Sequence, residues 1–350
     1  MTGSDMAGSD MRRTATIERA RNGPRFRLFY VTERARLTLN NLTFENGSVE
    51  EWRGGGLFNA GGTAVLNHCT VRGNEASDGT SGLDEVLAAA LTRAAGEETP
   101  VGAMRHLFRP SDVVGIKLNC IAGRGLSPSP ALVGRLCDHL REAGVPARNI
   151  VIWDRTDREL SAAGYEIVRS GSGVRCMGTE DDYERTPREW GAGGSCFAGI
   201  LVNDLTALIN VGVLKDHDLA GVSIGLKNWY GAIHNPNKHH AGGCAPYIPH
   251  LAACPLIREK LRLTVIDAST IQHQGGPARN PRWSATWNGV LASTDPVAVD
   301  AVGWRVIETH RKEAGLPSLA EEKREPTWIA AAGRLGLGQA EIGKIQLAQA

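Results

Sequence analysis

The second part of the chain alternates apolar runs with helical patterns. Residues 113–118 (VVGIKL) and 150–153 (IVIW) are apolar runs of the length typical of buried strands. Between them, Ser129 and Pro130 open a segment with one apolar stripe at helical spacing, and Gly144 ends it. A strand, a helix and a second strand within about 40 residues predict a right-handed, parallel βαβ unit.

The same alternation continues toward the C-terminus. Further strands are predicted at residues 205–214, 261–266 and 342–347, and further helices at residues 83–95, 296–307 and 327–335. The Gly-rich and charged segment 171–195 lacks such a pattern and indicates an excursion. The pattern predicts an α/β fold over residues 81–350, with a mostly parallel sheet, helices on both faces and two lobes.

The first part of the chain has a different pattern. In residues 31–78, RLTLNNLTFENG is followed by the similar AVLNHCTVRGN, so that Leu39 and Asn40 correspond to Leu66 and Asn67. Short alternating segments with Asn/Gly corners are typical of stacked coils. This segment resembles the repeats of right-handed parallel β-helices. Residues 1–30 are polar, and we expect them to form a disordered or poorly packed lead.

Composition and charge exclude several classes of function. The 350 residues carry 39 basic and 38 acidic side chains, so the net charge of +1 favours neither nucleic acid nor a membrane as partner. The seven cysteines form no CxxC pair, which argues against a zinc ribbon or an iron–sulfur cluster held by this chain. The Arg12-Arg13 pair is not followed by an apolar export segment, so we expect a cytoplasmic protein.

Polar and ionisable side chains gather where predicted strands end. Lys117 and Asn119 stand at the end of VVGIKL, Asp154 directly follows IVIW, and Asp267 follows LTVI. Ligands of open α/β sheets bind at the carboxyl ends of the strands, so these four are candidates to bind a cofactor or substrate. Two structural alternatives stay open: Asp154 as a turn cap, and Lys117 extending its ammonium to the surface.

The densest group of such residues lies in residues 209–240. Lys215 and His217 follow the apolar run, while Lys227 and Asn228 follow a segment of small residues. Small residues allow close approach of a ligand, and so many ionisable groups beside apolar strands carry a desolvation cost that function can explain. We therefore take Asp154, Lys215, His217 and Lys227 as candidate catalytic residues, and Asn228 as a further candidate to bind a cofactor.

Three histidines end the same stretch. His234, His239 and His240 lie on a loop rich in Pro, Asn and Gly, and imidazoles in such numbers can bind a divalent transition metal. Their spacing matches neither HExxH nor a Cys/His zinc motif. A solvated polar loop is the structural alternative. The sequence leaves the cofactor unidentified, with a divalent transition metal as the candidate.

From about residue 81 onward, the chain resembles a family of unknown function, DUF362. The matching segments are DVVGIKLNCIAGRGLS, NIVIWDR, INVGVLKDHDLAGVSIGLKNWYGAIHNPNKHH, GGCAPYI, LTVIDA and TDPVAVDAVGW. The resemblance carries no single activity. Some members of that family carry ferredoxin-type iron–sulfur segments, so the resemblance implies a ferredoxin-type redox partner as one option. Many members are exported by twin-arginine signals, which leaves a periplasmic location open. This chain has neither feature in recognisable form.

A shorter segment is similar to the lactate racemase family, which uses a nickel-pincer nucleotide. In HDLAGVSIGLK, His217 is followed by Ala-Gly and, ten residues on, by Lys227. The resemblance implies that His217 is a proton-transfer base and that Lys227 carries the cofactor. Ile224 stands where that family has a glycine, and the nickel-ligating histidine would be one of His234, His239 and His240.

Three functions are therefore open. The first is an enzyme that binds a metal or an anionic small molecule at the strand ends, such as a metal-dependent oxidoreductase or isomerase. The second is a non-catalytic accessory protein of an electron-transfer or maturation pathway. The third is a racemase or epimerase with a lysine-bound nickel-pincer cofactor.

Overall fold

The computed structural model describes residues 81–348 and, before them, nine short strands between Ala15 and Ala76. The chain divides into two compact units, Met1–Glu85 and Val86–Ala350. The division of the second unit into two lobes stays a prediction. The predicted lead of residues 1–30 lies outside the described residues except for β1 (Ala15–Glu18) and part of β2 (Phe29–Val31).

The strands of the first unit pair in parallel. The pairs are β1 with β4 (Leu42–Glu45), β4 with β8 (Thr70–Arg72), β2 with β6 (Leu57–Asn59), β3 (Arg36–Asn40) with β7 (Thr63–Asn67), and β5 (Ser48–Val49) with β9 (Glu75–Ala76). Leu39 pairs with Leu66 and Asn40 with Asn67, which is the correspondence seen in the sequence. The assignment to a β-helix stays a prediction.

The second unit is built on one mixed sheet, and the predicted α/β fold is confirmed. Its strand order is β12 (Arg175–Gly178), β11 (Ile150–Asp154), β10 (Val114–Lys117), β15 (Ala207–His217), β17 (Leu261–Gln272) and β18 (Ser284–Ser293), with β16 (Gly221–Ser223) paired to β15. The first five run parallel, and β18 and β16 run antiparallel to their neighbours. All eleven residues of β15 are buried, as expected for a central parallel strand.

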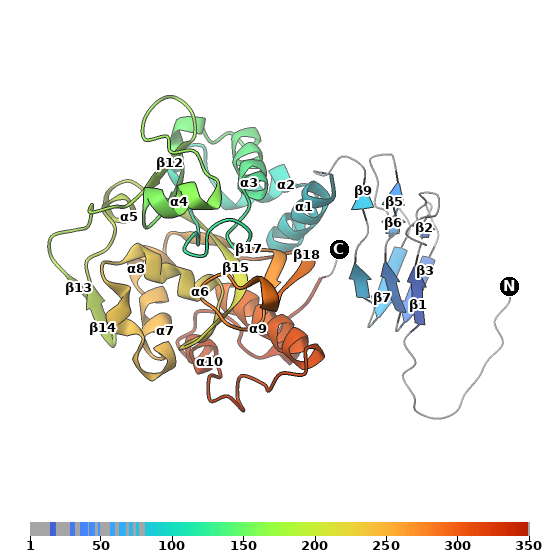
Figure 1. Cartoon of the computed structure of the whole chain (residues 1–350). Coiled ribbons are helices and arrows are strands. Elements are labelled where there is room, and N and C mark those ends of the chain that lie inside the picture. The colour runs from blue at the N-terminus through green and yellow to red at the C-terminus, as the bar shows by residue number, and fades with distance from the viewer. Residues whose placement is uncertain are drawn as a thin grey trace, which may run out of the picture. The chain divides into compact units, whose positions relative to one another are not determined.

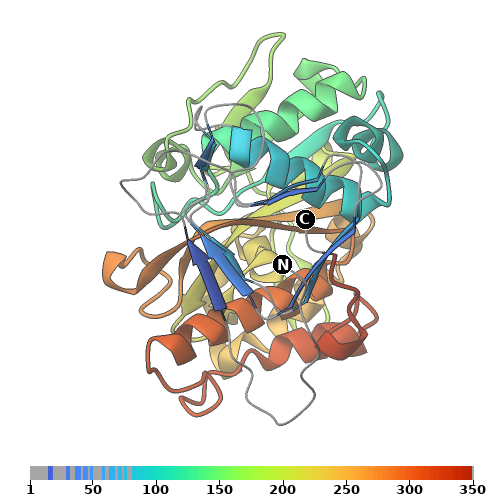
Figure 2. The same cartoon turned by 90° about the vertical axis from the view of Figure 1, so that its right-hand side faces the viewer.

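Helices cover both faces of this sheet (Figures 1 and 2). One face carries α2 (Pro100–Leu107), α3 (Pro130–Glu142) and α4 (Asp157–Ala163), which follow α1 (Ser81–Ala95) in the chain. The other carries α6 (Gly225–Asn228), α7 (Tyr247–Ala252), α9 (Pro296–Glu313) and α10 (Thr327–Arg334). The short helices α5 (Gly199–Asn203) and α8 (Pro255–Arg258) precede β15 and β17.

The helix caps follow the sequence. The Ser129 hydroxyl accepts a hydrogen bond from the Leu132 N–H at the start of α3, and the Asp295 carboxylate accepts from the N–H groups of Val297 and Ala298 at the start of α9. Side-chain oxygens at these positions satisfy donors that a helix leaves unpaired. Asp295 is therefore the N-cap of α9.

The ends of the sheet differ from the prediction. Residues 342–347 form no strand: they contain the 3₁₀ turn Ile342–Lys344, so the predicted last strand is wrong. The edge position belongs to β18. Most of its residues are only partly buried, and its apolar and polar residues alternate too weakly to reveal a strand. The segment 171–195 contains β12 and a small hairpin of β13 (Arg188–Trp190) and β14 (Gly193–Ser195). Within residues 81–348, no helix is long and apolar enough to cross a bilayer.

Candidate active site

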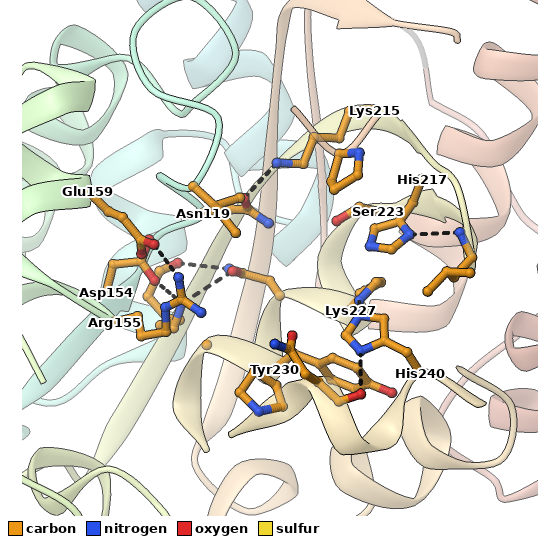
Figure 3. A pocket seen from close by; sticks show the side chains of 18 of the residues that line it. Asn119, Asp154, Arg155, Glu159, Lys215, His217, Ser223, Lys227, Tyr230 and His240 are labelled. Atoms are coloured by element: carbon orange, nitrogen blue, oxygen red, sulfur yellow. Dashed lines mark hydrogen bonds and ion pairs between the residues drawn. The ribbon is translucent and has the colours of Figure 1, made fainter. Parts of the chain in front are cut away.

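The carboxyl ends of β10, β11 and β15 border a cavity of about 350 Å³. These three strands are neighbours in the sheet and parallel, so their ends meet at one edge. The other wall comes from α6 and the segment that follows it (Figure 3). The lining residues are Lys117, Asn119, Ile121, Asp154, Arg155, Glu159, Lys215, His217, Asp218, Leu219, Ser223, Lys227, Asn228, Tyr230, Gly231, Pro236, Asn237, His240 and Pro277.

Lys117 and Asp154 form a buried ion pair at the base of this cavity. The Lys117 ammonium donates to Asp154 Oδ1 at 2.6 Å, to the Leu118 carbonyl at 2.6 Å and to Asn228 Oδ1 at 3.2 Å. Asp154 Oδ2 accepts from the Cys120 N–H at 2.7 Å. Each charge therefore has an opposite charge and further hydrogen bonds, which a buried pair requires. Lys117 is fully buried, so it does not extend to the surface.

Gly231 makes room for this pair. A Cβ atom at Gly231 would lie 2.6 Å from Lys117 Nζ and 3.1 Å from Asp154 Oδ1. A larger residue here would therefore displace the Lys117 ammonium from its position beside Asp154. The close approach of the 228–231 backbone is what lets Asn228 reach Lys117, and its amide nitrogen also donates to Asn210 Oδ1 at 2.7 Å.

Lys215 and Lys227 also border the cavity, but neither forms an ion pair with a carboxylate in the described part of the chain. Lys215 is fully buried and donates to Asn119 Oδ1 at 2.9 Å. Lys227 lies 3.1 Å from His240 Nε2 and 4.1 Å from the centre of the Tyr230 ring. Burial lowers the pKa of Lys215 to about 8, with Asp154 opposing and Lys227 reinforcing the shift. Burial also lowers the pKa of Lys227 to about 8.

His217 is held as a neutral ring. Its Nδ1 accepts from the N–H groups of Leu219 at 3.2 Å and Ala220 at 3.3 Å, which places the proton on Nε2. Burial, reinforced by Lys227, lowers the pKa of His217 to about 2. Asp218 Oδ1 lies 3.0 Å from the same nitrogen, but its side chain is mostly exposed, so burial and the backbone donors decide the state of the ring.

His217 and His240 stack against each other, with ring centres 5.6 Å apart. Burial and Lys227 lower the pKa of His240 as well. Its Nδ1 lies 3.3 Å from the Asn237 carbonyl, an arrangement in which Nδ1 donates and Nε2 is free to accept from Lys227. The cavity thus combines two neutral imidazoles with two lysine amines.

A buried carboxylate holds the helix that carries Lys227. Asp300, on α9, accepts from the N–H groups of Gly225 at 2.8 Å and Leu226 at 2.9 Å, at the start of α6. Burial raises the pKa of Asp300 to about 7, and the two N–H groups oppose the shift. Asp300 does not line the cavity and acts through α6.

Eight of the predicted site residues come together in this cavity: Lys117, Asn119, Asp154, Lys215, His217, Lys227, Asn228 and His240. Asp267 does not, because β17 continues past it to Gln272. Asp267 borders a smaller hollow, where Oδ2 accepts from the Ser129 N–H at 2.8 Å and Oδ1 from the Ser269 hydroxyl at 2.6 Å.

The three histidines predicted as metal ligands point to different places. His234 lies at the Tyr183 ring, His239 is buried against Trp190 and Tyr247, and only His240 lines the cavity. Among the described residues, no group of three or more His, Cys, Asp and Glu side chains is placed to hold a metal ion. The arrangement gives the trio no common ligand position, and metal binding stays a prediction.

Several lining residues were not predicted. Arg155 pairs with Glu159, four residues on in the chain, a helical spacing of opposite charges that was visible in the sequence. Tyr230 contacts Lys227 through its ring face and donates to the His239 carbonyl at 2.6 Å. Ser223 and Pro277 carried no local signal, because they reach the cavity only through long-range packing.

The comparison with protein families covers the segment that builds this cavity. The model of a family described as a domain of unknown function, DUF362, matches residues 114–305, which is 192 of the 350 residues. The match begins with β10 and ends in α9, so it includes every residue that lines the cavity. No curated protein matches the chain. Since the match spans more than half of its length, the chain belongs to the DUF362 family.

Proposed function

We propose that the cavity binds a small anionic molecule and that the protein is an enzyme acting on it. One observation carries the proposal: the Lys215 and Lys227 ammonium groups are almost completely buried beside the cavity without a carboxylate partner in the described residues. An unpaired buried charge is strongly unfavourable, and an anionic ligand would compensate it. A volume of about 350 Å³ suits a small molecule.

The other charges of the lining support this assignment. Lys117 is paired with Asp154, and Arg155 with Glu159. Asp218 is mostly exposed and forms no ion pair with either free lysine. Because the paired charges cancel, the interior of the cavity carries an excess of two positive charges. A carboxylate or a phosphate is the ligand chemistry that this excess favours.

The side chains also suggest roles in a reaction. With a pKa of about 8, Lys227 is mostly protonated at pH 7, so it suits a cationic hydrogen-bond donor to the anion and a general acid. His217 presents Nε2–H from a neutral ring, so it suits a hydrogen-bond donor to a substrate oxygen better than the base that its resemblance to lactate racemases implied. The paired Asp154 and Lys117 would form part of the base of the site.

Anion binding to variants tests the proposal. Dissociation constants for inorganic phosphate and malonate would be measured by calorimetry for the wild type, Lys215→Met and Lys227→Met. Because charge-assisted hydrogen bonds contribute about 1.5–3 kcal/mol, each variant should bind at least one of these anions about 10–100-fold more weakly. Lys312→Met, at an exposed position on α9, is the control. Unchanged binding in both cavity variants would reject the proposal.

A cofactor joined to Lys227 is a second proposal, favoured by the position of Lys227 and His217 in one cavity. The histidines fit it only in part, since His234 and His239 lie outside the lining. Intact mass spectrometry of protein from cells able to make such a cofactor tests it, and an unmodified Lys227 would contradict it. A non-catalytic accessory role would instead show a stable ferredoxin complex and no turnover.

A further inference from the structure

Exposure orders the lining of the cavity from its floor to its mouth. Lys215 is 0% exposed and Lys227 is 6% exposed, so the free cations lie at the floor. Ile121 is 55% exposed and Leu219 is 52% exposed, so these two lie at the mouth. The cavity therefore changes along its depth from charged to apolar.

The apolar mouth is unusual for this molecule. Among the described residues, only four large apolar side chains are exposed: Ile121, Leu219, Leu335 and Leu347. Single exposed apolar residues need no explanation, but two of these four border the same cavity. Ile121 lies in the loop after β10 and Leu219 in the turn after β15, and these strands are neighbours in the sheet.

The mouth also disfavours a second negative charge on the ligand. Asp218 lines the cavity with a side chain that is 63% exposed, so its carboxylate lies near the opening. Pro236 and Pro277 contribute further apolar surface to the lining. The outer part of a ligand would thus meet apolar side chains and one like charge, while its inner part meets two cations.

We propose that the ligand is an amphipathic anion: a carboxylate or phosphate group held at Lys215 and Lys227, with an apolar portion that packs against Ile121 and Leu219. The inference rests on the proposed function, because it places the anionic group at the same two lysines. It adds the chemical class of the remainder of the ligand. Burial of apolar surface at the mouth would then contribute to affinity.

A chain-length series tests the inference. Calorimetry would compare acetate, butanoate, hexanoate and octanoate in one arm, and phosphate with ethyl, butyl and hexyl phosphate in the other, all below micellar concentrations. The affinity should rise about two- to fourfold per methylene that reaches the mouth. The arm with the tighter binding identifies the head group.

Variants locate the effect. Ile121→Ser/Leu219→Ser should remove most of the chain-length dependence and leave the affinity for acetate or phosphate within twofold. Leu335→Ser, at an exposed position outside the cavity, should keep the full dependence. A circular dichroism spectrum and an unchanged short-anion affinity would show that the double variant is folded.

The outcomes separate this inference from the proposed function. If short anions bind through Lys215 and Lys227 but affinity is flat along both series, the amphipathic ligand is rejected and the anion site stands. If the dependence persists in the double variant, or disappears equally in Leu335→Ser, the assigned mouth is wrong. If no anion binds, both proposals fail.

Discussion

Lys215 and Asp216 are neighbours on β15, and both are almost completely buried, but they lie in opposite charge environments. Successive side chains of a strand point to opposite faces, so Lys215 lies at the cavity and Asp216 on the other side. Asp216 lies 2.8 Å from an Arg324 nitrogen and 3.7 Å from an Arg311 nitrogen, and it accepts from the Gly276 N–H at 2.9 Å.

The two faces differ in whether charge is balanced. Behind the strand, the carboxylates of Asp216 and Glu322 meet the guanidinium groups of Arg311 and Arg324. Arg324 also donates to the His217 carbonyl at 3.1 Å, so this network fixes the strand end. At the cavity, Lys215 and Lys227 form no ion pair with a carboxylate among the described residues. A balanced cluster is what a structural role needs, whereas the unbalanced one is the feature on which the proposed anionic ligand rests.

The largest effect on stability should follow from removing one arginine of the balanced cluster on the face of β15 that carries Asp216. Arg311 is fully buried and also donates to the carbonyls of His273 at 2.9 Å and Pro317 at 2.7 Å. Arg311→Met would leave buried acceptors unpaired and one carboxylate in excess. We expect a loss of about 3–5 kcal/mol in the free energy of unfolding, measured by urea denaturation.

Arg305→Met, on the same helix but exposed, is the matched control and should change stability by less than about 0.5 kcal/mol. Equal effects of the two substitutions would mean that the balanced cluster contributes nothing specific to the fold.

The same strand ends show what local sequence can and cannot predict. Lys117, Asp154 and Lys215 were predicted together because parallel neighbouring strands end at one edge, and the apolar runs located those ends within a few residues. The prediction misplaced Asp267 because the apolar run LTVI ends six residues before β17 does.

The pattern of apolar and polar residues could not predict features that depend on contacts between distant parts of the chain. His239 is buried against Trp190, which comes from the distant β13–β14 hairpin, and against Tyr247 at the start of α7. The edge strand β18 is only half buried and lacks a clear apolar alternation. Nothing in the local sequence distinguishes the free Lys215 from the paired Lys117, since the difference lies in which side chains reach each ammonium.

A smaller effect of opposite sign on the free energy of unfolding is expected on the cavity face of β15, which carries Lys215. Lys215→Met would remove an uncompensated buried charge, and Asn119, which is only partly buried, could bond to water instead. Replacement of buried charge by an apolar side chain is often stabilising, so the ligand-free variant should gain about 1–3 kcal/mol in urea denaturation at pH 7. A loss of similar size would show that Lys215 supports the fold.

The stability gain of Lys215→Met over the wild type should shrink as the pH rises. The pKa of Lys215 is lowered from 10.5 to about 8, so between these values the unfolded chain binds more protons than the folded one. Wild-type stability relative to Lys215→Met should therefore increase through this window, and the two proteins should converge near pH 10. Denaturation at pH 7, 8, 9 and 10 measures the difference. A constant difference would indicate that the Lys215 pKa is the same in both states.

The smallest effect concerns the charge at the mouth. Asp218 is mostly exposed, and its carboxylate repels an anion approaching the cavity. Asp218→Asn keeps an oxygen for the Leu219 N–H, which now donates to Asp218 Oδ1 at 2.9 Å, and removes only the charge. The affinity for phosphate should rise about twofold in low salt. It should return to the wild-type value at about 0.5 M salt, where exposed charges interact over only a few ångströms because salt screens them. Asp204→Asn, at an exposed position just before β15, lies at the opposite end of the strand and should leave the affinity unchanged. An equal increase in both variants would mean that only the net charge of the protein matters. The affinity would then depend on the lysines at the floor of the cavity and not on the local charge of Asp218 at its mouth.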